Sequence, residues 1–264
     1  MDYQLKNKTA LVTGSTSGIG FAIVQLLAKE GAHVIINGRH DEGVARAMAE
    51  LKNEIPLARM SGMVADFSAK ESVAGMIPKI ENVDILVNNV GIFTSQTFAD
   101  TPDEDWYKLY EVNVMSGVRL SRAVLPKMLE RNWGRIIFIS SECAQLVPVD
   151  LIPYSMTKAA LLCISRGLAQ TTKGTAVTVN TVMPGSTMSE GAKRFLKAQA
   201  AKEERTEDAV AADFFKNVRT TSLLGRFASP EEIANAAVYL ASPLSSATNG
   251  AVLKVEGGSV PGIL

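Results

Sequence analysis

The sequence predicts an α/β fold in which one parallel sheet is covered by helices on both faces. Strand-like apolar runs alternate with amphipathic helical segments along nearly the whole chain. The strand-like runs are almost continuously apolar, which is typical of strands that are buried on both faces of a parallel sheet. Because crossovers between parallel strands are right-handed, such an alternation produces a doubly wound sheet.

The elements can be assigned in order along the chain. The expected strands cover residues 9–12, 33–37, 60–66, 83–87, 135–139, 177–181 and 251–255. The expected helices begin with a segment that contains residues 23–27 and continue with residues 41–53, 69–80, 103–131, 154–171 and 230–241. Two capping boxes with Pro at the first helical position, Thr101–Glu104 and Ser229–Glu232, are predicted to open the helices that follow them.

One segment interrupts this alternation. Between Gly185 and Ser229 no strand-like run appears, and charged residues stand beside apolar pairs. We interpret residues 186–228 as a pair of mobile helices that form a lid, because the segment leaves the carboxyl end of a strand, where such sheets bind ligands. A solvated surface insertion is the alternative. No linker or repeat divides the chain, so residues 1–264 are predicted to form a single domain.

Composition limits the classes of partner. The 27 basic and 27 acidic residues cancel, so no net charge attracts nucleic acid or an anionic membrane. No apolar run approaches membrane-spanning length. Two cysteines without a C-x-x-C motif indicate reduced thiols in a cytoplasmic protein. The two histidines belong to no Cys/His cluster, so no metal site is predicted.

A glycine-rich turn, Thr13–Gly20, follows the first strand and opens the first helix. Glycines let the backbone approach a pyrophosphate, and a helix N-terminus offers unpaired N–H groups and the positive end of its dipole. The spacing G-x-x-x-G-x-G differs from the general dinucleotide fingerprint, and no Lys follows the last glycine as in a Walker loop. A Gly/Ser-rich connector is the alternative. The predicted cofactor contacts in this turn are Gly14, Thr16, Ser17, Gly18, Ile19 and Gly20.

Ser141, Tyr154 and Lys158 form the candidate catalytic set. Ser141 ends the fifth strand, and Tyr154 and Lys158 share one helix face at positions i and i+4. A free Tyr, with a pKa of about 10, is a poor base at neutral pH, but a nearby cation favours the phenolate and lowers that pKa. Two donors on one substrate oxygen also stabilise the alkoxide that develops during hydride transfer. Tyr and Lys one turn apart are common on helix surfaces, but their combination with Ser141 and the glycine-rich turn favours a catalytic role.

These motifs together resemble the short-chain dehydrogenase/reductase family. The matching stretches, in family order, are Thr13-Gly-x-x-x-Gly-Ile-Gly20, Asn88-Asn89-x-Gly91, Asn113, Ser141, Tyr154-x-x-x-Lys158, Pro184-Gly185, Pro230-Glu-Glu-Ile233 and Asn249-Gly250. The resemblance implies a seven-stranded Rossmann-type sheet, a nicotinamide cofactor and a Ser–Tyr–Lys site. It also implies that Asn113 is a fourth catalytic member, which kinks its helix and holds a water near Lys158.

The resemblance extends to further cofactor contacts. By position in the motifs these are Asp66 at the adenine, and Asn89, Gly91, Tyr154, Lys158, Pro184, Gly185 and Thr187. Two departures stand out. Val90 replaces the usual Ala, and the usual Thr after Gly185 is out of register, so either Thr187 or Ser189 could meet the nicotinamide amide.

The end of the second strand bears on the choice of cofactor. An acidic residue there binds the ribose 2′-hydroxyl of NAD, whereas Arg accommodates the 2′-phosphate of NADP. Here Gly38 takes the acidic position and Arg39 follows it. A guanidinium suits a phosphate dianion, so NADP(H) is favoured over NAD(H), although Ser17 leaves the turn without the second basic residue that some NADP enzymes carry.

The predicted activity is NADPH-dependent reduction of a carbonyl compound to an alcohol, or the reverse reaction, with Tyr154 as general acid or base. Predicted substrate contacts are Phe93, Ser141, Glu142 and Tyr154, and Glu142 either meets a polar substrate group or points to solvent. Family resemblance suggests a 3-oxoacyl type of substrate. The alternatives are a catalytically silent cofactor-binding regulatory protein and an isomerase or dehydratase that uses the cofactor transiently. The resemblance also implies a homo-oligomer, a tetramer or dimer.

Overall fold

All seven strands of the sheet run parallel. The computed structural model describes residues 2–263 and orders the strands β3-β2-β1-β4-β5-β6-β7. The strands are β1 (Thr9–Val12), β2 (His33–Gly38), β3 (Arg59–Val64), β4 (Ile85–Asn88), β5 (Gly134–Ile139), β6 (Val177–Pro184) and β7 (Val252–Val255). This order confirms the doubly wound, Rossmann-type sheet that the sequence predicts.

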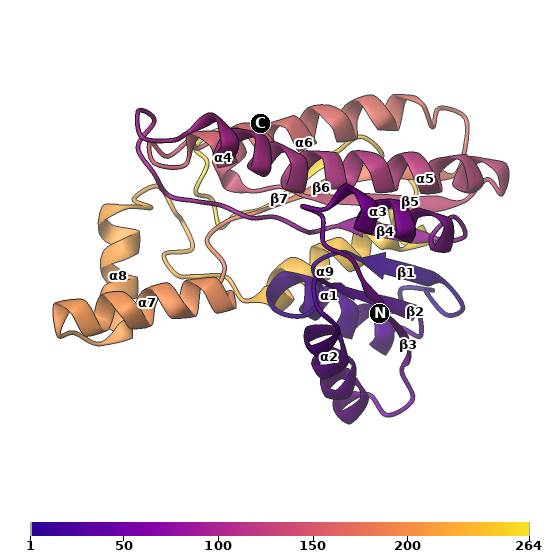
Figure 1. Cartoon of the computed structure of the whole chain (residues 1–264), viewed down its shortest axis with the longest axis horizontal. Coiled ribbons are helices and arrows are strands. Elements are labelled where there is room, and N and C mark those ends of the chain that lie inside the picture. The colour runs from indigo at the N-terminus through magenta and orange to yellow at the C-terminus, as the bar shows by residue number, and fades with distance from the viewer. Residues whose placement is uncertain (1, 264) are drawn as a thin grey trace.

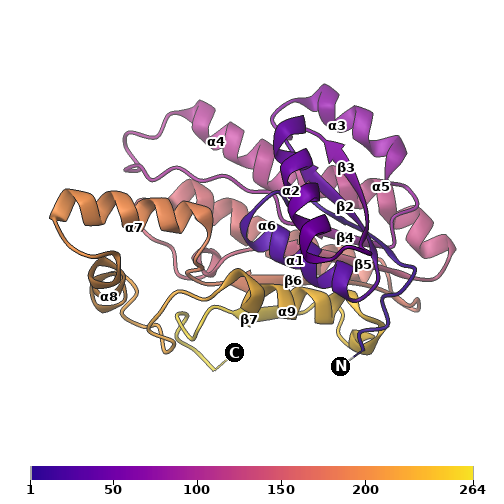
Figure 2. The same ribbon diagram turned by 90° about the horizontal axis from the view of Figure 1, so that it is seen from below.

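Helices cover both faces of this sheet (Figures 1 and 2). The helices are α1 (Gly18–Lys29), α2 (Asp41–Glu54), α3 (Lys70–Met76), α4 (Asp103–Tyr110), α5 (Ser116–Glu130), α6 (Ile152–Gln170), α7 (Glu190–Glu203), α8 (Glu207–Asn217) and α9 (Pro230–Ala241). On one face α1, α2 and α9 bury Leu27, Leu51 and Val238 against the strands. On the other, α3, α5 and α6 bury Met76, Leu120 and Leu161.

The sheet places the glycine-rich turn and Ser141 at the same side, beyond the carboxyl ends of its strands. The strand order reverses between β1 and β4, and ligands of such sheets bind beyond the carboxyl ends of the strands at this reversal. β1 delivers the turn, β4 delivers Asn89, and β5 delivers Ser141 at that edge. The parallel register, for example Val12 beside Val87, keeps these strand ends level.

Several boundaries differ from the predicted ones. β3 ends at Val64, so Asp66 lies beyond the strand, and β4 begins at Ile85. β6 runs on to Pro184, and its final residue pairs with Val255 of β7. The helix predicted over 69–80 is α3 followed by a short 3₁₀ turn, η1 (Ile77–Lys79). The helix predicted over 103–131 is interrupted by a π-helical segment, η2 (Glu111–Met115), between α4 and α5.

The two predicted capping boxes have different outcomes. At α9, Ser229 Oγ accepts the amide of Glu232 at 3.3 Å, and Glu232 Oε2 accepts the amide of Ser229 at 2.8 Å, which confirms the box. At α4 the prediction is wrong. The N-cap is Pro102, which has no side chain that can cap, and the Thr101 hydroxyl donates to the carbonyl oxygen of Thr97 instead.

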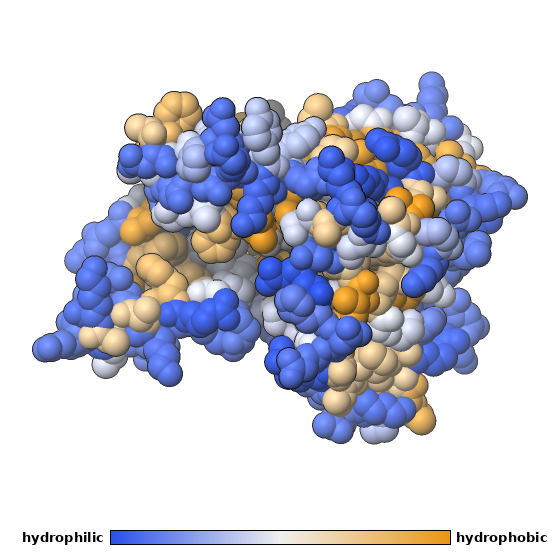
Figure 3. All heavy atoms as spheres, viewed as in Figure 1, coloured by the Kyte–Doolittle hydropathy of each residue, from blue (hydrophilic) through white to orange (hydrophobic). Residues whose placement is uncertain are grey.

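The segment predicted as a lid does form two helices. In Figure 1, α7 and α8 project from the left end of the molecule. They pack on each other through a small apolar cluster of their own, in which Leu196, Ala200 and Val210 are buried. Figure 3 shows the molecular face hollowed between these helices and the rest of the protein, with apolar residues in the hollow. Their mobility stays a prediction.

Among residues 2–263, every helix is too short or too polar to span a lipid bilayer.

Candidate functional site

The glycine-rich turn is braced from two neighbouring strands. The amide of Gly14 donates to Asn37 Oδ1 at 3.0 Å, and Asn37 Nδ2 donates to the Met63 carbonyl. Asn89 Nδ2 donates to the carbonyls of Thr13 and Gly14 at 2.9 and 3.0 Å. These bonds fix the backbone at the start of the turn, at Thr13 and Gly14.

Glycine is required in this turn for conformation and for space. Gly14 and Gly18 have φ of +59° and +58°, a left-handed backbone that side chains disfavour. A Cβ at Gly20 would lie 2.5 Å from both Asn89 Nδ2 and the Gly14 carbonyl oxygen. The turn therefore fits closely against the end of β4.

The N-terminus of α1 lacks the partners that helix ends usually have. The N-cap residue Ser17 accepts no hydrogen bond from the helix through its side chain, and the first turn contains no acidic residue. The first N–H groups of α1 and the positive end of its dipole therefore have no side-chain cap from Ser17 and no acidic side chain of the first turn beside them. A phosphate group satisfies both requirements.

Arg39 and Asp66 lie near each other at the ends of β2 and β3. Arg39 is exposed directly after β2, and a Cβ at Gly38 would lie 2.6 Å from the side chain of Thr16 in the turn. Asp66 accepts the Ser68 amide at 2.9 Å and the Ser68 hydroxyl at 2.8 Å, and these bonds, with the charges of Arg39 and His40, lower the pKa of Asp66.

A second hollow lies on the outer side of the turn. This groove of about 670 Å³ separates α1 and α2 from the start of α7 and is lined by the cations Arg46 and Lys193. Four glutamates also line it: Glu50, Glu54, Glu190 and Glu231. Opposite charges mix there, and Thr16, Ser17 and Gly18 of the glycine-rich turn form part of its wall, so the groove adjoins the predicted phosphate contacts. Arg39 does not line it and remains the candidate reader of a 2′-phosphate.

Three of the four candidate catalytic residues line one cavity of about 280 Å³, and the fourth, Asn113, lies outside its lining. β5 supplies Ser141 and α6 supplies Tyr154 and Lys158, one turn apart. The cavity is lined by Ile19, Asn89, Gly91, Phe93, Ile139, Ser140, Ser141, Tyr154, Lys158, Pro184, Gly185, Thr187 and Ser189. It therefore joins Ser141, Tyr154 and Lys158 to the cofactor contacts predicted after β4 and β6 and to Ile19, but not to Arg39, Asp66 or the glycines of the turn.

Lys158 is buried at the floor of this cavity. Its Nζ donates to the Ile139 carbonyl at 3.0 Å and lies 5.6 Å from the centre of the Tyr154 ring. Burial lowers the pKa of Lys158 to about 8. A Cβ at Gly91 would lie 3.2 Å from Nζ, so glycine at this position leaves room for the ammonium group.

Tyr154 differs from the expected phenolate. Burial raises the pKa of Tyr154 above its ordinary value, while a hydrogen bond with Ser141 acts in the opposite direction. In the protein alone, desolvation outweighs this hydrogen bond, so the lowered pKa that the sequence predicts for Tyr154 beside Lys158 is not found. A protonated Tyr154 suits proton donation. Phe93 packs edge-to-face on its ring, with the centroids 5.9 Å apart.

Asn113 lies in the π-helical segment η2, as a kink at this residue would require. Its Oδ1 accepts the Ile92 amide at 2.8 Å, and its Nδ2 donates to the Ile92 carbonyl and to Thr157 Oγ1. The side chain thus ties the loop after β4 to the helix that carries Tyr154.

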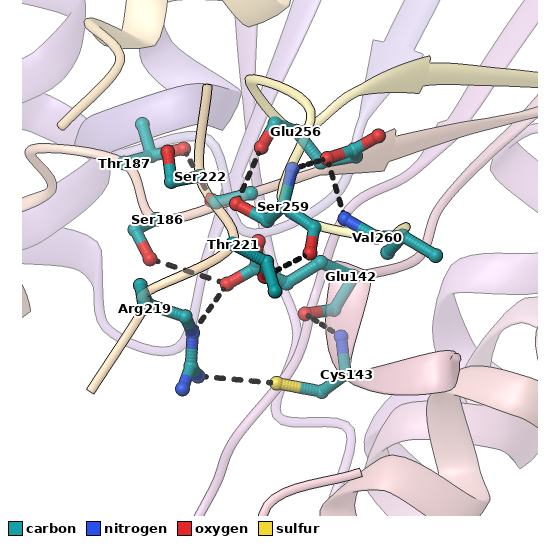
Figure 4. Close-up of polar contacts among 12 residues, drawn as sticks. Glu142, Cys143, Ser186, Thr187, Arg219, Thr221, Ser222, Glu256, Ser259 and Val260 are labelled. Carbon is teal, nitrogen blue, oxygen red and sulfur yellow. Dashed lines mark hydrogen bonds and ion pairs between the residues drawn. The ribbon is translucent and has the colours of Figure 1, made fainter. Parts of the chain in front are cut away.

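The solvent-facing alternative for Glu142 is wrong, whereas its contact with substrate stays a prediction. The side chain is buried, and its Oε1 accepts from Arg219 Nε at 2.8 Å and from Ser186 Oγ at 3.2 Å (Figure 4). Arg219 follows α8, so this ion pair joins the end of the lid segment to the residue beside Ser141.

Thr187 and Ser189, the two candidates for contact with the nicotinamide amide, both line the cavity. Thr187 Oγ1 donates to the Gly185 carbonyl at 2.9 Å, so its lone pairs stay available. Ser189 Oγ accepts the Ala192 amide at 3.3 Å as the N-cap of α7. A Cβ at Gly185 would lie 2.7 Å from the Glu256 backbone, so this position admits only glycine without rearrangement.

Three residues of the site were not predicted: Thr13, Asn37 and Arg219. Thr13 Oγ1 accepts the amides of Asn89 and Val90. Asn37 could have been predicted, because it is a polar residue in the apolar run that forms β2 and a buried amide needs hydrogen-bond partners. Nothing near Arg219 in the sequence indicates its partner, since Glu142 lies 77 residues away.

Known proteins of similar sequence are oxidoreductases. An uncharacterised oxidoreductase of Bacillus subtilis, YvrD, is 48% identical over 98% of this chain and 99% of its own length. A 3-oxoacyl-[acyl-carrier-protein] reductase of Aquifex aeolicus is 34% identical over 98% of this chain and 99% of its own.

A solved structure supports the same relationship. L-sorbose reductase of Gluconobacter frateurii, complexed with NADPH and L-sorbose, superposes with a TM-score of 0.93 at 31% identity, and the match covers 100% of both chains. The family model described as short chain dehydrogenase matches residues 8–200. The family match, the order of the strands and the residues of the cavity agree. The chain therefore belongs to the short-chain dehydrogenase family of oxidoreductases.

Proposed function

We propose that this protein is an NADP(H)-dependent reductase of carbonyl compounds. The observation that carries the proposal is the shared cavity, in which Ser141, Tyr154 and Lys158 stand beside Asn89, Gly91 and Thr187. The NADPH complex of the similar L-sorbose reductase supports the choice of cofactor. NADPH supplies a hydride to the carbonyl carbon when it is bound, and the alcohol product takes its proton from the protein.

The residues around the turn fit such a cofactor. The uncapped N-terminus of α1 and the left-handed Gly14 and Gly18 suit the pyrophosphate. Exposed Arg39 suits the 2′-phosphate, and Asp66 lies beside it for the adenine end. Thr187 is the better candidate for the nicotinamide amide, because Ser189 already accepts a hydrogen bond as a cap.

The catalytic roles follow from charge and protonation. Tyr154, kept protonated by burial, donates its proton to the carbonyl oxygen. Ser141 holds that oxygen with a second hydrogen bond, and the Lys158 ammonium stabilises the charge on Tyr154 after transfer. Asn113 positions α6 through Thr157. Phe93, packed on the Tyr154 ring, forms the apolar wall of the substrate site, and residues 186–228 act as its lid.

The assembly and location belong to the same proposal. Large side chains are exposed on α4, where Tyr107 is 72% exposed, and on the edge strand β7, where Val252 is 39% exposed. These surfaces suit contacts with further copies of the chain, and we propose a homo-oligomer, a tetramer or dimer. Light scattering that finds only monomer would contradict this. Two free cysteines suit the reducing cytoplasm.

The proposal is tested by following NADPH absorbance with a broad panel of ketones and aldehydes. One NADPH should be consumed per carbonyl reduced, and the alcohol should appear by mass spectrometry. Substrate conversion without stoichiometric NADPH consumption would favour the isomerase or dehydratase instead. Tight NADPH binding with no conversion of any compound would favour a regulatory protein.

A further inference from the structure

The hydroxyl of Ser141 is held by the short 3₁₀ turn that follows it, η3 (Glu142–Ala144). Ser141 is the N-cap of this turn, and its Oγ accepts the amide of Cys143 at 3.2 Å. The carbonyl of Glu142 in turn accepts the amide of Leu146 at 2.8 Å. Because Ser141 Oγ accepts from the backbone, its own hydrogen is free to be donated. The direction of that donation therefore depends on where η3 lies.

The carboxylate of Glu142, the first residue of η3, is buried and depends on partners. The side chain is only 3% exposed, and Oε1 accepts from Arg219 Nε at 2.8 Å and from Ser186 Oγ at 3.2 Å. The other oxygen, Oε2, is buried without a hydrogen-bond partner among residues 2–263. Since a buried charge is costly unless it is paired, Arg219 supplies the cation that stabilises a charged Glu142 in this position. The ion pair thus fixes η3 against the stretch after α8.

Arg219 is itself held by contacts that do not involve η3. Its amide donates to the Phe214 carbonyl at 2.9 Å, its carbonyl accepts the Ser222 amide at 3.1 Å, and its guanidinium lies 5.6 Å from the centre of the Phe214 ring. Two residues further along, the Thr221 hydroxyl donates to the carbonyl of Ser259 in the loop after β7 (Figure 4). The guanidinium therefore has a fixed place from which it holds the first residue of η3.

The ion pair can act on the reaction only through its neighbours in the chain. Arg219 and Glu142 lie outside the lining of the catalytic cavity, whereas Ser141, directly before Glu142, lines it. A hydrogen bond weakens steeply when its distance and angle depart from the preferred values. A displacement of η3 by about 1 Å is therefore enough to impair catalysis by Ser141.

We propose that Arg219 is a positioning residue, which through its ion pair with Glu142 holds η3 so that the hydroxyl of Ser141 points at the substrate oxygen. This inference rests on the proposed reductase function. Ser141 is proposed to stabilise the charge that develops on that oxygen during the reaction. A misplaced hydroxyl therefore lowers kcat more than it changes the KM for the ketone or the affinity for NADPH.

The first test is Arg219→Met, which keeps an unbranched side chain but leaves Glu142 without its cation. With the best ketone of the panel, kcat should fall about 10- to 100-fold, while the KM for the ketone and the NADPH dissociation constant change by less than about threefold. Arg219→Lys retains a cation and should recover part of the lost kcat. An unchanged kcat in Arg219→Met would overturn the inference.

The matched control is Arg226→Met, which removes a cation a few residues further along the chain. Arg226 pairs with Glu232, and the two side chains are 55% and 41% exposed. Because an exposed ion pair contributes little, this variant should keep kcat within about twofold of the wild-type value. An equal fall in kcat in both variants would show a general effect of lost charge and would overturn the inference.

A second comparison asks whether Arg219 acts through Ser141. In Ser141→Ala no hydroxyl remains to be positioned, so adding Arg219→Met should lower the single-turnover rate of NADPH oxidation by less than about threefold. If Arg219→Met lowers the rate as much in Ser141→Ala as in the wild-type protein, Arg219 acts elsewhere and the inference is wrong.

Folding is separated from positioning by dividing each rate by the concentration of NADPH-binding sites. If Arg219→Met does not fold, Glu142→Gln replaces it, because this variant keeps the shape of the side chain and weakens the bond to Arg219. Its kcat should fall about tenfold, and this fall should again disappear in Ser141→Ala. A wild-type protein that consumes no NADPH with any ketone would instead refute the proposed function, and the inference with it.

Discussion

At the residue scale, the environment of Lys158 predicts how activity depends on pH. Burial lowers its pKa to about 8, so the ammonium that supports Tyr154 loses its proton as pH rises through this value. We expect kcat/KM for carbonyl reduction to be highest below about pH 8 and to decrease above it. A pH profile of the initial rate measures this, and constant kcat/KM up to pH 10 would show that the charge of Lys158 is not required.

Arg39 carries the second prediction at this scale. Its guanidinium is exposed at the end of β2, and its proposed partner is a phosphate that NADPH has and NADH lacks. Arg39→Ala should weaken NADPH binding about 10- to 100-fold and change NADH binding by less than about threefold. Cofactor fluorescence titration gives both dissociation constants. Equal losses for the two cofactors, or no loss, would remove Arg39 from the 2′-phosphate site.

The residue scale also shows where sequence reasoning stops. Ser141, Tyr154 and Lys158 could be predicted because their spacing brings them to one strand end and one helix face. The partner of Glu142 could not, because Arg219 reaches it from a segment whose path no local pattern determines. The pKa of Tyr154 was expected to be low, since a sequence reveals a nearby cation but not the depth of burial that opposes it.

At the scale of elements, the two similar capping sequences give a direct stability test. Ser229→Ala removes a hydroxyl that accepts the Glu232 amide, so it should lower the free energy of unfolding by about 1 kcal/mol. Thr101→Ala is the matched control, because its hydroxyl donates to Thr97 and caps no helix; its effect should be less than half as large. Chemical denaturation measures both, and equal losses would contradict the assigned caps.

The capping boxes also show why element boundaries were less predictable than the elements themselves. The residue pattern at Thr101–Glu104 is favourable, but the hydroxyl has a competing acceptor one turn earlier in the chain. Likewise, the residue pattern predicts a regular helix through residues 111–115, and only the family resemblance indicated the kink at Asn113, where the hydrogen bonding is π-helical. Local geometry of this kind depends on contacts with other elements.

At the scale of the whole molecule, the parallel sheet and its functional edge were predictable because the crossover rule leaves few arrangements open. Each predicted strand is present, and the lid segment contains its two helices. How residues 186–228 meet the rest of the protein was not predictable. The helices α7 and α8 share a small apolar cluster of their own, and the ion pair with Glu142 comes from Arg219, in the irregular stretch after α8.

In the proposed reaction, the hydroxyl of Tyr154 donates the proton that completes carbonyl reduction. Tyr154→Phe removes only the hydroxyl, and the ring can keep its packing against Phe93. The measurement is kcat for NADPH oxidation with the best substrate of the panel, alongside the NADPH dissociation constant. We expect kcat to fall about 10²- to 10⁴-fold, with NADPH binding unchanged within about threefold. A variant that keeps kcat within about tenfold of the wild-type value would contradict this role of Tyr154.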